Sequence, residues 1–320
     1  MATRFRARSA SASSREGRAI EALFSDGMTL LSVAVKFAAY AATLLAAGSA
    51  LAVWSLSELN YETRSETRRV AVLAALAAAV FSALRLPLRA WFLTGGTLRE
   101  AAEPTIFGLI INSPLGTSLE IRLAGLALIL FLVTDGRAAQ FIAATGAAIV
   151  AASFAFRGHS LGEPRLALGV LIWLHMLAVS FWIGGFHPLH RLALADAKQA
   201  GFAAREFGRI ALVTVALLAV SGIALLYLFT GDPIAALATP YGRIFTLKLL
   251  AFAALMAIAA GNKLWLTPAL LKGRPQAGSR LRRAIRLEVR IVAVILAVTA
   301  VFTTVTSPER PGEPAGMQMH

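Results

Sequence analysis

Eight segments of this chain are apolar over the length that crosses a lipid bilayer, and this feature decides its fold class. A membrane-spanning helix needs about 20 apolar residues in a row, whereas an open sheet edge would leave backbone polar groups without partners in hydrocarbon. The apolar segments are residues 37–57, 70–92, 117–133, 138–156, 166–190, 210–231, 244–262 and 291–308. We therefore expect an all-α, polytopic transmembrane bundle of eight helices. Residues 105–115 are apolar but too short to span, so we expect an interfacial or re-entrant segment there.

The composition agrees with a membrane protein and excludes several kinds of chemistry. Hydrophobic residues make up 58% of the chain and charged residues 15%, against about 45–50% and about 25% in soluble domains. The chain has no cysteine, which excludes disulfides, thiolate metal sites and cysteine nucleophiles. It has no phosphate-binding glycine loop, nucleophile elbow or zinc-protease motif, so we do not expect an enzyme. Small residues inside the segments let helices approach closely, and the glycines among them include Gly146, Gly184, Gly185 and Gly222.

Positive charge predicts how the chain is organised and oriented. The 31 Lys and Arg exceed the 17 Asp and Glu by 14, and they lie between apolar segments, where they face anionic lipid rather than nucleic acid. The densest cluster, in residues 263–290, favours the cytoplasmic side for the loop after the seventh segment. Both termini then lie outside. The expected parts are a basic, disordered N-terminal tail (1–27), the membrane domain (28–308) and a flexible C-terminal tail (309–320).

A short motif occurs twice and indicates an internal repeat. Ser-Pro-Leu-Gly at residues 113–116 is followed by Arg122, and Thr-Pro-Tyr-Gly at residues 239–242 is followed by Lys248. Each cation lies six residues after its glycine. The copies begin the third and seventh segments, and a repeat of four helices, an even number, keeps its orientation, so both would face one side of the membrane, together with His159 and Tyr241. The match is consistent with two four-helix halves, and chance is the alternative. We expect both cations to snorkel to lipid phosphate.

Histidines mark three levels of the membrane. His175 lies near the middle of segment 166–190, His159 precedes this segment, and His187 and His190 end it. An ionisable side chain at membrane depth is a functional hypothesis by default. The alternative is that His175 only hydrogen-bonds a neighbouring helix, while the other histidines sit at the interfaces.

Methionines near these histidines indicate a binding site for a soft metal ion. Met176 adjoins His175, Met256 lies mid-depth in segment 244–262, and Met-Gln-Met-His occupies residues 317–320. Imidazole with thioether suits Cu(I), whereas Mg²⁺ or Ca²⁺ would need carboxylates and carbonyls. The alternatives are core filling for Met256 and an incidental sequence for the tail. The candidate metal ligands are His159, His175, Met176, Met256, Met317, Met319 and His320.

Haem is a second cofactor hypothesis. Axial ligation between helices needs two histidines at the same depth, and His175 has no partner at its level. We therefore rank haem below copper, while one haem at an interface through His159 stays open.

An ordered set of short motifs resembles the copper resistance protein D (CopD-type) family of membrane proteins. The resemblance covers residues 155–308 well and the first four helices only in general pattern. Its pieces are Gly158-His159, Leu174-His175-Met176-Leu177-Ala178, Trp182-Ile183-Gly184-Gly185, Phe207, Ser221-Gly222, Thr239-Pro240-Tyr241-Gly242-Arg243, Leu247-Lys248, Asn262, Pro268, Leu281-Arg282-Arg283 and Glu288. Each piece is short, and their order along the chain carries the resemblance.

The resemblance implies an eight-helix protein of the bacterial inner membrane that moves copper, often beside a small periplasmic copper-binding protein. It implies periplasmic termini, and it adds Trp182, Tyr241, Lys248 and Glu288 to the candidate site residues. We expect transport of Cu(I) without ATP hydrolysis, with copper ions and the lipid bilayer as partners. The alternatives are a haem-binding or oxidase-assembly membrane protein and a structural subunit of a membrane complex.

Overall fold

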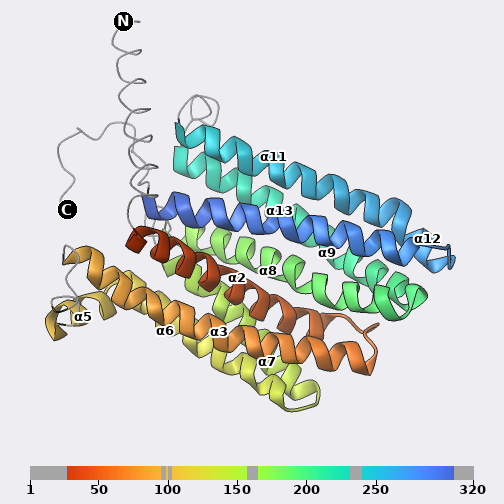
Figure 1. Cartoon of the computed structure of the whole chain (residues 1–320), viewed down its shortest axis with the longest axis horizontal. Coiled ribbons are helices and arrows are strands. Elements are labelled where there is room, and N and C mark those ends of the chain that lie inside the picture. The colour runs from red at the N-terminus through yellow and green to blue at the C-terminus, as the bar shows by residue number, and fades with distance from the viewer. Residues whose placement is uncertain (1–26, 95–98, 100–102, 157–164, 231–239, 306–320) are drawn as a thin grey trace, which may run out of the picture.

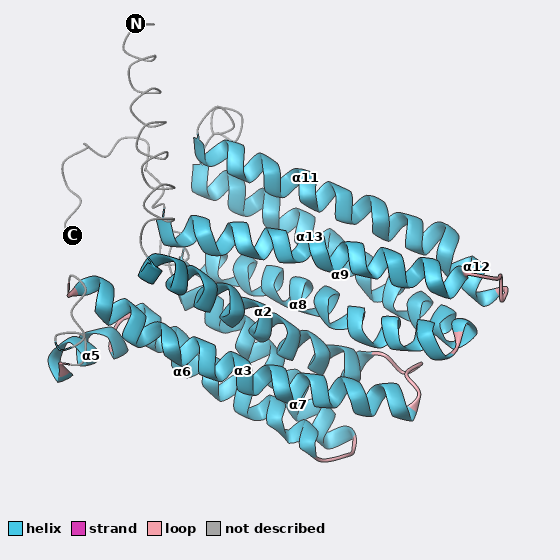
Figure 2. Ribbon diagram, in the orientation of Figure 1, coloured by secondary structure: helices cyan, strands magenta, loops and turns pink. Residues whose placement is uncertain are grey.

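The computed structural model describes residues 27–94, 99, 103–156, 165–230 and 240–305 (Figure 1). Every regular element in these residues is helical (Figure 2), which confirms the all-α class. In chain order the elements are α2 (Gly27–Ser55), α3 (Tyr61–Leu93), α5 (Pro104–Ile111), α6 (Pro114–Ile129), η1 (Leu130–Val133), α7 (Arg137–Ala152), η2 (Ser153–Phe156), α8 (Arg165–Ala195), α9 (Ala197–Thr230), α11 (Pro240–Gly261), η4 (Asn262–Leu266), α12 (Thr267–Leu271) and α13 (Ala277–Val305). The elements η1 and η2 are 3-10 turns, and η4 is a π-helical turn.

Seven stretches of helix in the described residues are long and apolar enough to cross a bilayer, against eight expected segments. They are α2, α3, α6 with η1, α7 with η2, α8, α9, and Leu249–Leu271, where α11 continues through η4 into α12. The eighth expected segment, 291–308, forms the second half of α13 as far as Val305. The first half of α13 carries five arginines and Glu288, which sets this helix apart. Residues 105–115 form the short helix α5 and the start of α6, so they do not span, as expected.

The long helices alternate in direction along one bundle axis (Figure 1). One end, which we call the termini end, holds the first residue of α2 and the last described residue of α13, together with the starts of α6, α8 and α11. The opposite end, which we call the arginine end, holds the short connections α2–α3, α8–α9 and α12–α13. Helix α2 is central, since it contacts α3, α7, α8 and α13.

Two hydrophobic cores share α2. The first joins α2 to α3, α6 and α7, and nine of its fourteen buried residues are alanine. Such small side chains let these helices pack closely. The second joins α2 to α8, α9, α12 and α13 and contains larger side chains, including Phe181, Trp182 and Phe186. This division agrees with the expected two halves of the bundle.

Helices α2 and α8 touch through two glycines. A Cβ atom on Gly48 would overlap the carbonyl of Ser180, and one on Gly184 would overlap the backbone of Gly48. Gly146, facing Gly125, has the same role between α7 and α6. Gly222, which we also expected at a close helix contact, has no atom within 4 Å of where its Cβ would stand. That expectation is wrong, because Gly222 faces open space.

Arginines at the arginine end cap the C-termini of helices. Arg64 Nη1 donates to the Val53 carbonyl at 2.7 Å, and its Nη2 donates to the Leu56 carbonyl at 2.9 Å. Arg68 Nη2 donates to the Leu132 carbonyl at 2.8 Å. The last carbonyls of a helix have no intrahelical donors. Part of the positive charge at this end therefore stabilises helix ends instead of facing lipid.

Both copies of the repeated motif begin a helix at their proline, α6 and α11, and both helices start at the termini end (Figure 1). Arg122 points into the bundle, however, and is only 1% exposed. Its Nε donates to Ser153 Oγ at 3.1 Å, and its guanidinium lies 4.5 Å from the centre of the Phe154 ring. Our expectation that Arg122 snorkels to lipid phosphate is therefore wrong. The side chain of Lys248 lies outside the described part of the chain.

Gly184→Ala tests the crossing of α2 and α8. The added methyl group would meet backbone atoms, which cannot rotate away as a side chain can. We expect a loss of about 1–3 kcal/mol in the free energy of unfolding, the range for an overpacked core, measured as loss of helical circular dichroism on heating in detergent. Gly222→Ala is the matched control, since the same methyl group there meets open space. Equal melting of the two variants would contradict a backbone contact at Gly184.

Candidate functional site

Helix α8 carries three of the candidate site residues, His175, Met176 and Trp182, and its contact with α2 sets their direction. The helix packs against α2, α7, α9 and α13. Gly184 faces α2, and successive residues of a helix turn by about 100°. His175, nine residues earlier, and Trp182, two residues earlier, therefore lie on the face of α8 that points away from α2, toward the second half of the bundle.

His175 is held by a serine of α9. Its Nδ1 lies 3.3 Å from Ser221 Oγ, and the Ser221 hydroxyl donates to the Leu218 carbonyl at 3.2 Å. A serine hydroxyl has one proton to donate, and the Leu218 carbonyl and the His175 ring are both within reach of it. When that proton goes to Leu218, the ring donates to the serine from Nδ1, and Nε2 keeps its lone pair. This is the tautomer that can bind a metal ion through Nε2.

The two expected thioether ligands lie in the second core. Met176 of α8 and Met256 of α11 are both partly buried against the cluster that joins α8, α9 and α13. The described residues contain no group of three His, Asp or Glu side chains that could hold a metal ion. A metal ion held near His175 by three ligands from this part of the chain would therefore need at least one sulfur, hydroxyl or carbonyl ligand.

Three residues far apart in the sequence form a second polar cluster. Glu288 of α13 is 4% exposed, and its Oε1 accepts a hydrogen bond of 2.6 Å from Asn262 Nδ2. The indole N–H of Trp182 interacts with the same carboxyl group but is outside the geometry of a hydrogen bond. Asn262 begins the π-helical turn η4, and such turns occur often at functional sites.

The His175–Ser221 pair and the Glu288 cluster lie at different heights along the bundle axis. His175 and Trp182 are seven residues apart on α8, which places them on one helix face about 10 Å apart along the axis. His175 is the nearer of the two to the termini end, and the Glu288 cluster lies toward the arginine end. The interior face of α8 thus presents an imidazole and then an indole that borders a buried carboxyl group.

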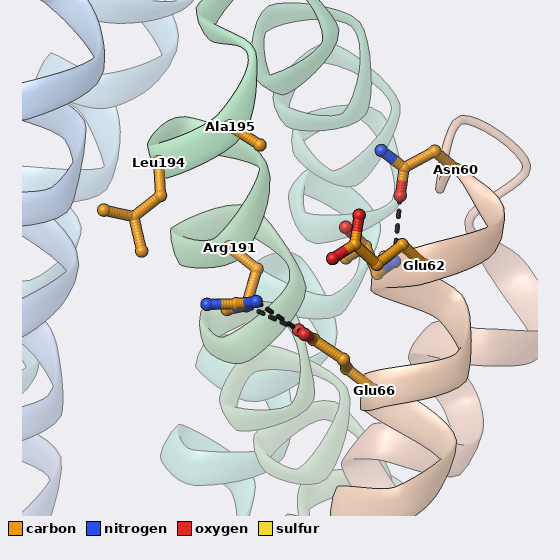
Figure 3. Close-up of a pocket in the computed structure, with 7 residues that line it drawn as sticks. Asn60, Glu62, Glu66, Arg191, Leu194 and Ala195 are labelled. Carbon is orange, nitrogen blue, oxygen red and sulfur yellow. Dashed lines mark hydrogen bonds and ion pairs between the residues drawn. The ribbon is translucent and has the colours of Figure 1, made fainter.

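The arginine end of α8 forms an ion pair that the sequence patterns did not predict. The Arg191 guanidinium donates two hydrogen bonds of 2.5 Å to the Glu66 carboxylate of α3 (Figure 3). One turn earlier, His187 Nδ1 lies 3.4 Å from Thr67 Oγ1. These contacts tie α8 to α3. The ion pair borders a cavity of about 140 Å³ lined by Asn60, Glu62, Thr63, Glu66, Arg191, Leu194 and Ala195.

Several predicted site residues lie outside what the structure describes. His159, Met317, Met319 and His320 are outside the described residues. Tyr241 and Lys248 lie in the first half of α11, and their side chains are outside the described part. The described histidines are His175, His187 and His190, all on α8. The described residues therefore offer no pair of histidines on two helices for axial haem ligation.

Asn262→Ala tests the bond to Glu288. Without the amide, the buried carboxyl loses a hydrogen-bond donor, and a buried polar group left in this way costs about 1–3 kcal/mol. We expect a lower melting temperature in detergent. The same substitution in a Glu288→Leu background should cost less, because no carboxyl group remains to be satisfied. An equal cost in both backgrounds would contradict the bond.

Comparison with known proteins gives two family matches. The family described as copper resistance protein D matches residues 202–302, and the copper resistance protein D-like N-terminal domain matches residues 27–164. The chain is 25% identical over 271 residues to a Bacillus subtilis (strain 168) protein named copper transport protein CutJ. That alignment covers 78% of this chain and 49% of the relative, so the chain spans about half the length of the relative. No solved structure matches significantly.

Proposed function

This chain belongs to the copper resistance protein D family, and from this premise we propose that it carries Cu(I) across the bacterial inner membrane through its helical bundle. Copper is the cargo of the proposed activity. The family is one of copper resistance membrane proteins rather than a class of enzymes. The proposal includes the oxidation state of the copper ion, the bacterial inner membrane as the location, and the side of that membrane on which the two termini lie.

The observation that carries the proposal is the contact between His175 and Ser221 inside the bundle. Nδ1 of His175 lies 3.3 Å from Ser221 Oγ, and we propose that the ring donates to this serine from Nδ1 and keeps the lone pair of Nε2 for the ion. Histidines that bind metals are commonly fixed in this way, with one nitrogen on the metal and the other held by a neighbouring group. We propose that Nε2 of His175 is the central ligand for the passing ion.

Met176 and Met256 supply the preference for Cu(I). Cu(I) accepts few ligands and prefers soft ones such as thioethers. Both sulfur atoms belong to the core beside α8, and we propose that they contact the ion before or after His175. A transported ion must bind well enough to enter and weakly enough to leave. Ligands spread over successive positions satisfy this condition better than one closed site.

We propose that the arginine end faces the cytoplasm and the termini end faces the periplasm. The cluster of Lys and Arg in residues 263–290 supports this orientation. His159 and the tail residues Met317, Met319 and His320 would then lie at the periplasmic mouth, where they would raise the local concentration of copper. A small periplasmic copper-binding protein would exchange the ion there. Tyr241 and Lys248 would lie near the same mouth.

His175→Ala is the first test of this function. We expect uptake of Cu(I) into proteoliposomes, with copper kept reduced and counted by mass spectrometry, to fall to the level of protein-free vesicles. The reason is that the variant lacks the only nitrogen ligand proposed at mid-depth. His187→Ala, on the same helix but bound to Thr67, is the matched control and should keep its uptake.

Ser221→Ala tests whether His175 binds the ion or only supports the fold, because it removes the group that orients the ring and keeps the ring itself. Loss of the group that orients a metal-binding histidine typically costs about tenfold to a hundredfold in affinity or activity. We expect an intermediate uptake, between that of the original protein and that of His175→Ala. Normal uptake by a folded His175→Ala protein would reject His175 as the central ligand.

Met256→Leu tests the thioether. Leucine keeps the volume of the side chain, so the free energy of unfolding should change by less than about 1.5 kcal/mol, while the soft ligand is lost. We expect slower uptake at limiting Cu(I) with an unchanged melting temperature. Met28→Leu, in the first turn of α2, is the matched control. Equal uptake by both variants would assign Met256 to core packing alone.

A further inference from the structure

Glu288 is a buried carboxyl group that the proposed copper ligands do not include. It lies 11 residues after the start of α13, which is about 16 Å along the helix from the arginine end. Only 4% of the residue is exposed. An ionised carboxylate in such a position is unfavourable unless it is paired with a cation, binds a metal or takes up a proton.

The groups that face this carboxyl carry no charge. They are the Asn262 amide from η4 and the Trp182 indole from α8. None of the ion pairs in the described part of the chain includes Glu288. The carboxyl group therefore lies among polar but neutral neighbours.

Several charged groups on α13 and on the elements packed against it have partners other than Glu288. On α13 itself, Arg282 and Arg286 act on His190 of α8. On the neighbouring elements, Lys36 of α2 donates to the Thr303 carbonyl, Lys263 of η4 donates to the Gly208 carbonyl, and Arg209 of α9 acts on Glu206. Helix α12 has no charged residue, and the side chain of Lys248 on α11 lies outside the described part.

Both protonation states of Glu288 have a partner in this cluster. The protonated carboxyl can accept the Asn262 hydrogen bond through its carbonyl oxygen. The ionised carboxylate can accept that bond and a second one from Trp182, whose buried N–H lies near it without a completed hydrogen bond. A small shift of the indole would supply this second bond. The site is therefore suited to reversible protonation without a rearrangement of the fold.

Copper at His175 would alter this balance. A Cu(I) ion there brings one positive charge into a medium of low dielectric constant, about two helical turns along α8 from the indole beside Glu288. The positive charge favours the ionised carboxylate. Release of the Glu288 proton as copper arrives would keep the net charge of the interior unchanged.

We propose that Glu288 is a proton-binding site and that Cu(I) at His175 exchanges with its proton. The carboxylate oxygen takes up one proton from water and returns it to water when copper binds, with no change in oxidation state. The exchange with copper rests on the function proposed above. The identity of Glu288 as a proton site does not depend on it.

The proton site can be tested without copper. Infrared spectra of the membrane-embedded protein should contain the carbonyl stretch of a protonated carboxylic acid, which disappears as pH rises. Glu288→Gln should lack this band and remain folded, because the glutamine oxygen can still accept from Asn262. Glu103→Gln, at an exposed carboxyl before α5, is the matched control and should keep the band. A spectrum with no band that depends on Glu288 would overturn the proposal.

The exchange is tested by adding Cu(I) to detergent-solubilised protein in weak buffer with a pH-sensitive dye. We expect close to one proton released for each Cu(I) bound, and none from Glu288→Gln. Glu288→Asp, which keeps an ionisable group, should restore part of the release. If copper binds to the original protein without releasing a proton, the exchange is rejected. If the original protein binds no copper, the proposed function fails, and the infrared band still decides whether Glu288 is a proton site.

Discussion

The contact between Gly48 and Gly184 determines how the rest of the bundle can be arranged. Because the backbones of α2 and α8 touch there, neither helix can rotate about its axis without a steric overlap. This contact directs the opposite face of α8 toward α9 and α13, and that face carries His175 and Trp182. The close approach also lets α2 belong to both hydrophobic cores. The polar side chains of α8 therefore point as they do because Gly48 and Gly184 have no side chains.

The two halves of the bundle differ in what they contribute. The core of the first half is mainly alanine, whose small side chain lets helices pack closely but offers no chemistry. The second half contains the imidazole, thioether, indole, amide and carboxyl groups on which both proposals rest. Two of the buried polar groups in the second half are paired, His175 with Ser221 and Glu288 with Asn262, whereas the buried Trp182 indole N–H has no completed hydrogen bond. Such pairing is needed because no water is present in hydrocarbon to replace a missing partner.

Copper passage and proton binding place different demands on this interior. A soft cation needs neutral donor atoms that it can leave, whereas a proton site needs a carboxyl group whose two charge states are both supported. About two turns of α8 separate His175 from Trp182, the indole that borders Glu288. That distance is short enough for the charge of one site to affect the other and long enough to avoid direct competition for ligands.

The hydropathy of the sequence by itself determined the class of fold, the positions of the long helices and the short segment at α5, because the thickness of a bilayer sets the length of an apolar helix. It also identified His175, Met176 and Met256 as interior groups, and the family resemblance added Trp182 and Glu288. Only the tertiary structure decided which way these side chains point. Asn262 and Glu288 meet, and Arg122 faces Ser153 instead of lipid, because helix rotation depends on contacts such as Gly48 with Gly184. Those contacts join residues that are distant along the chain, and hydropathy along a single segment carries no information about them.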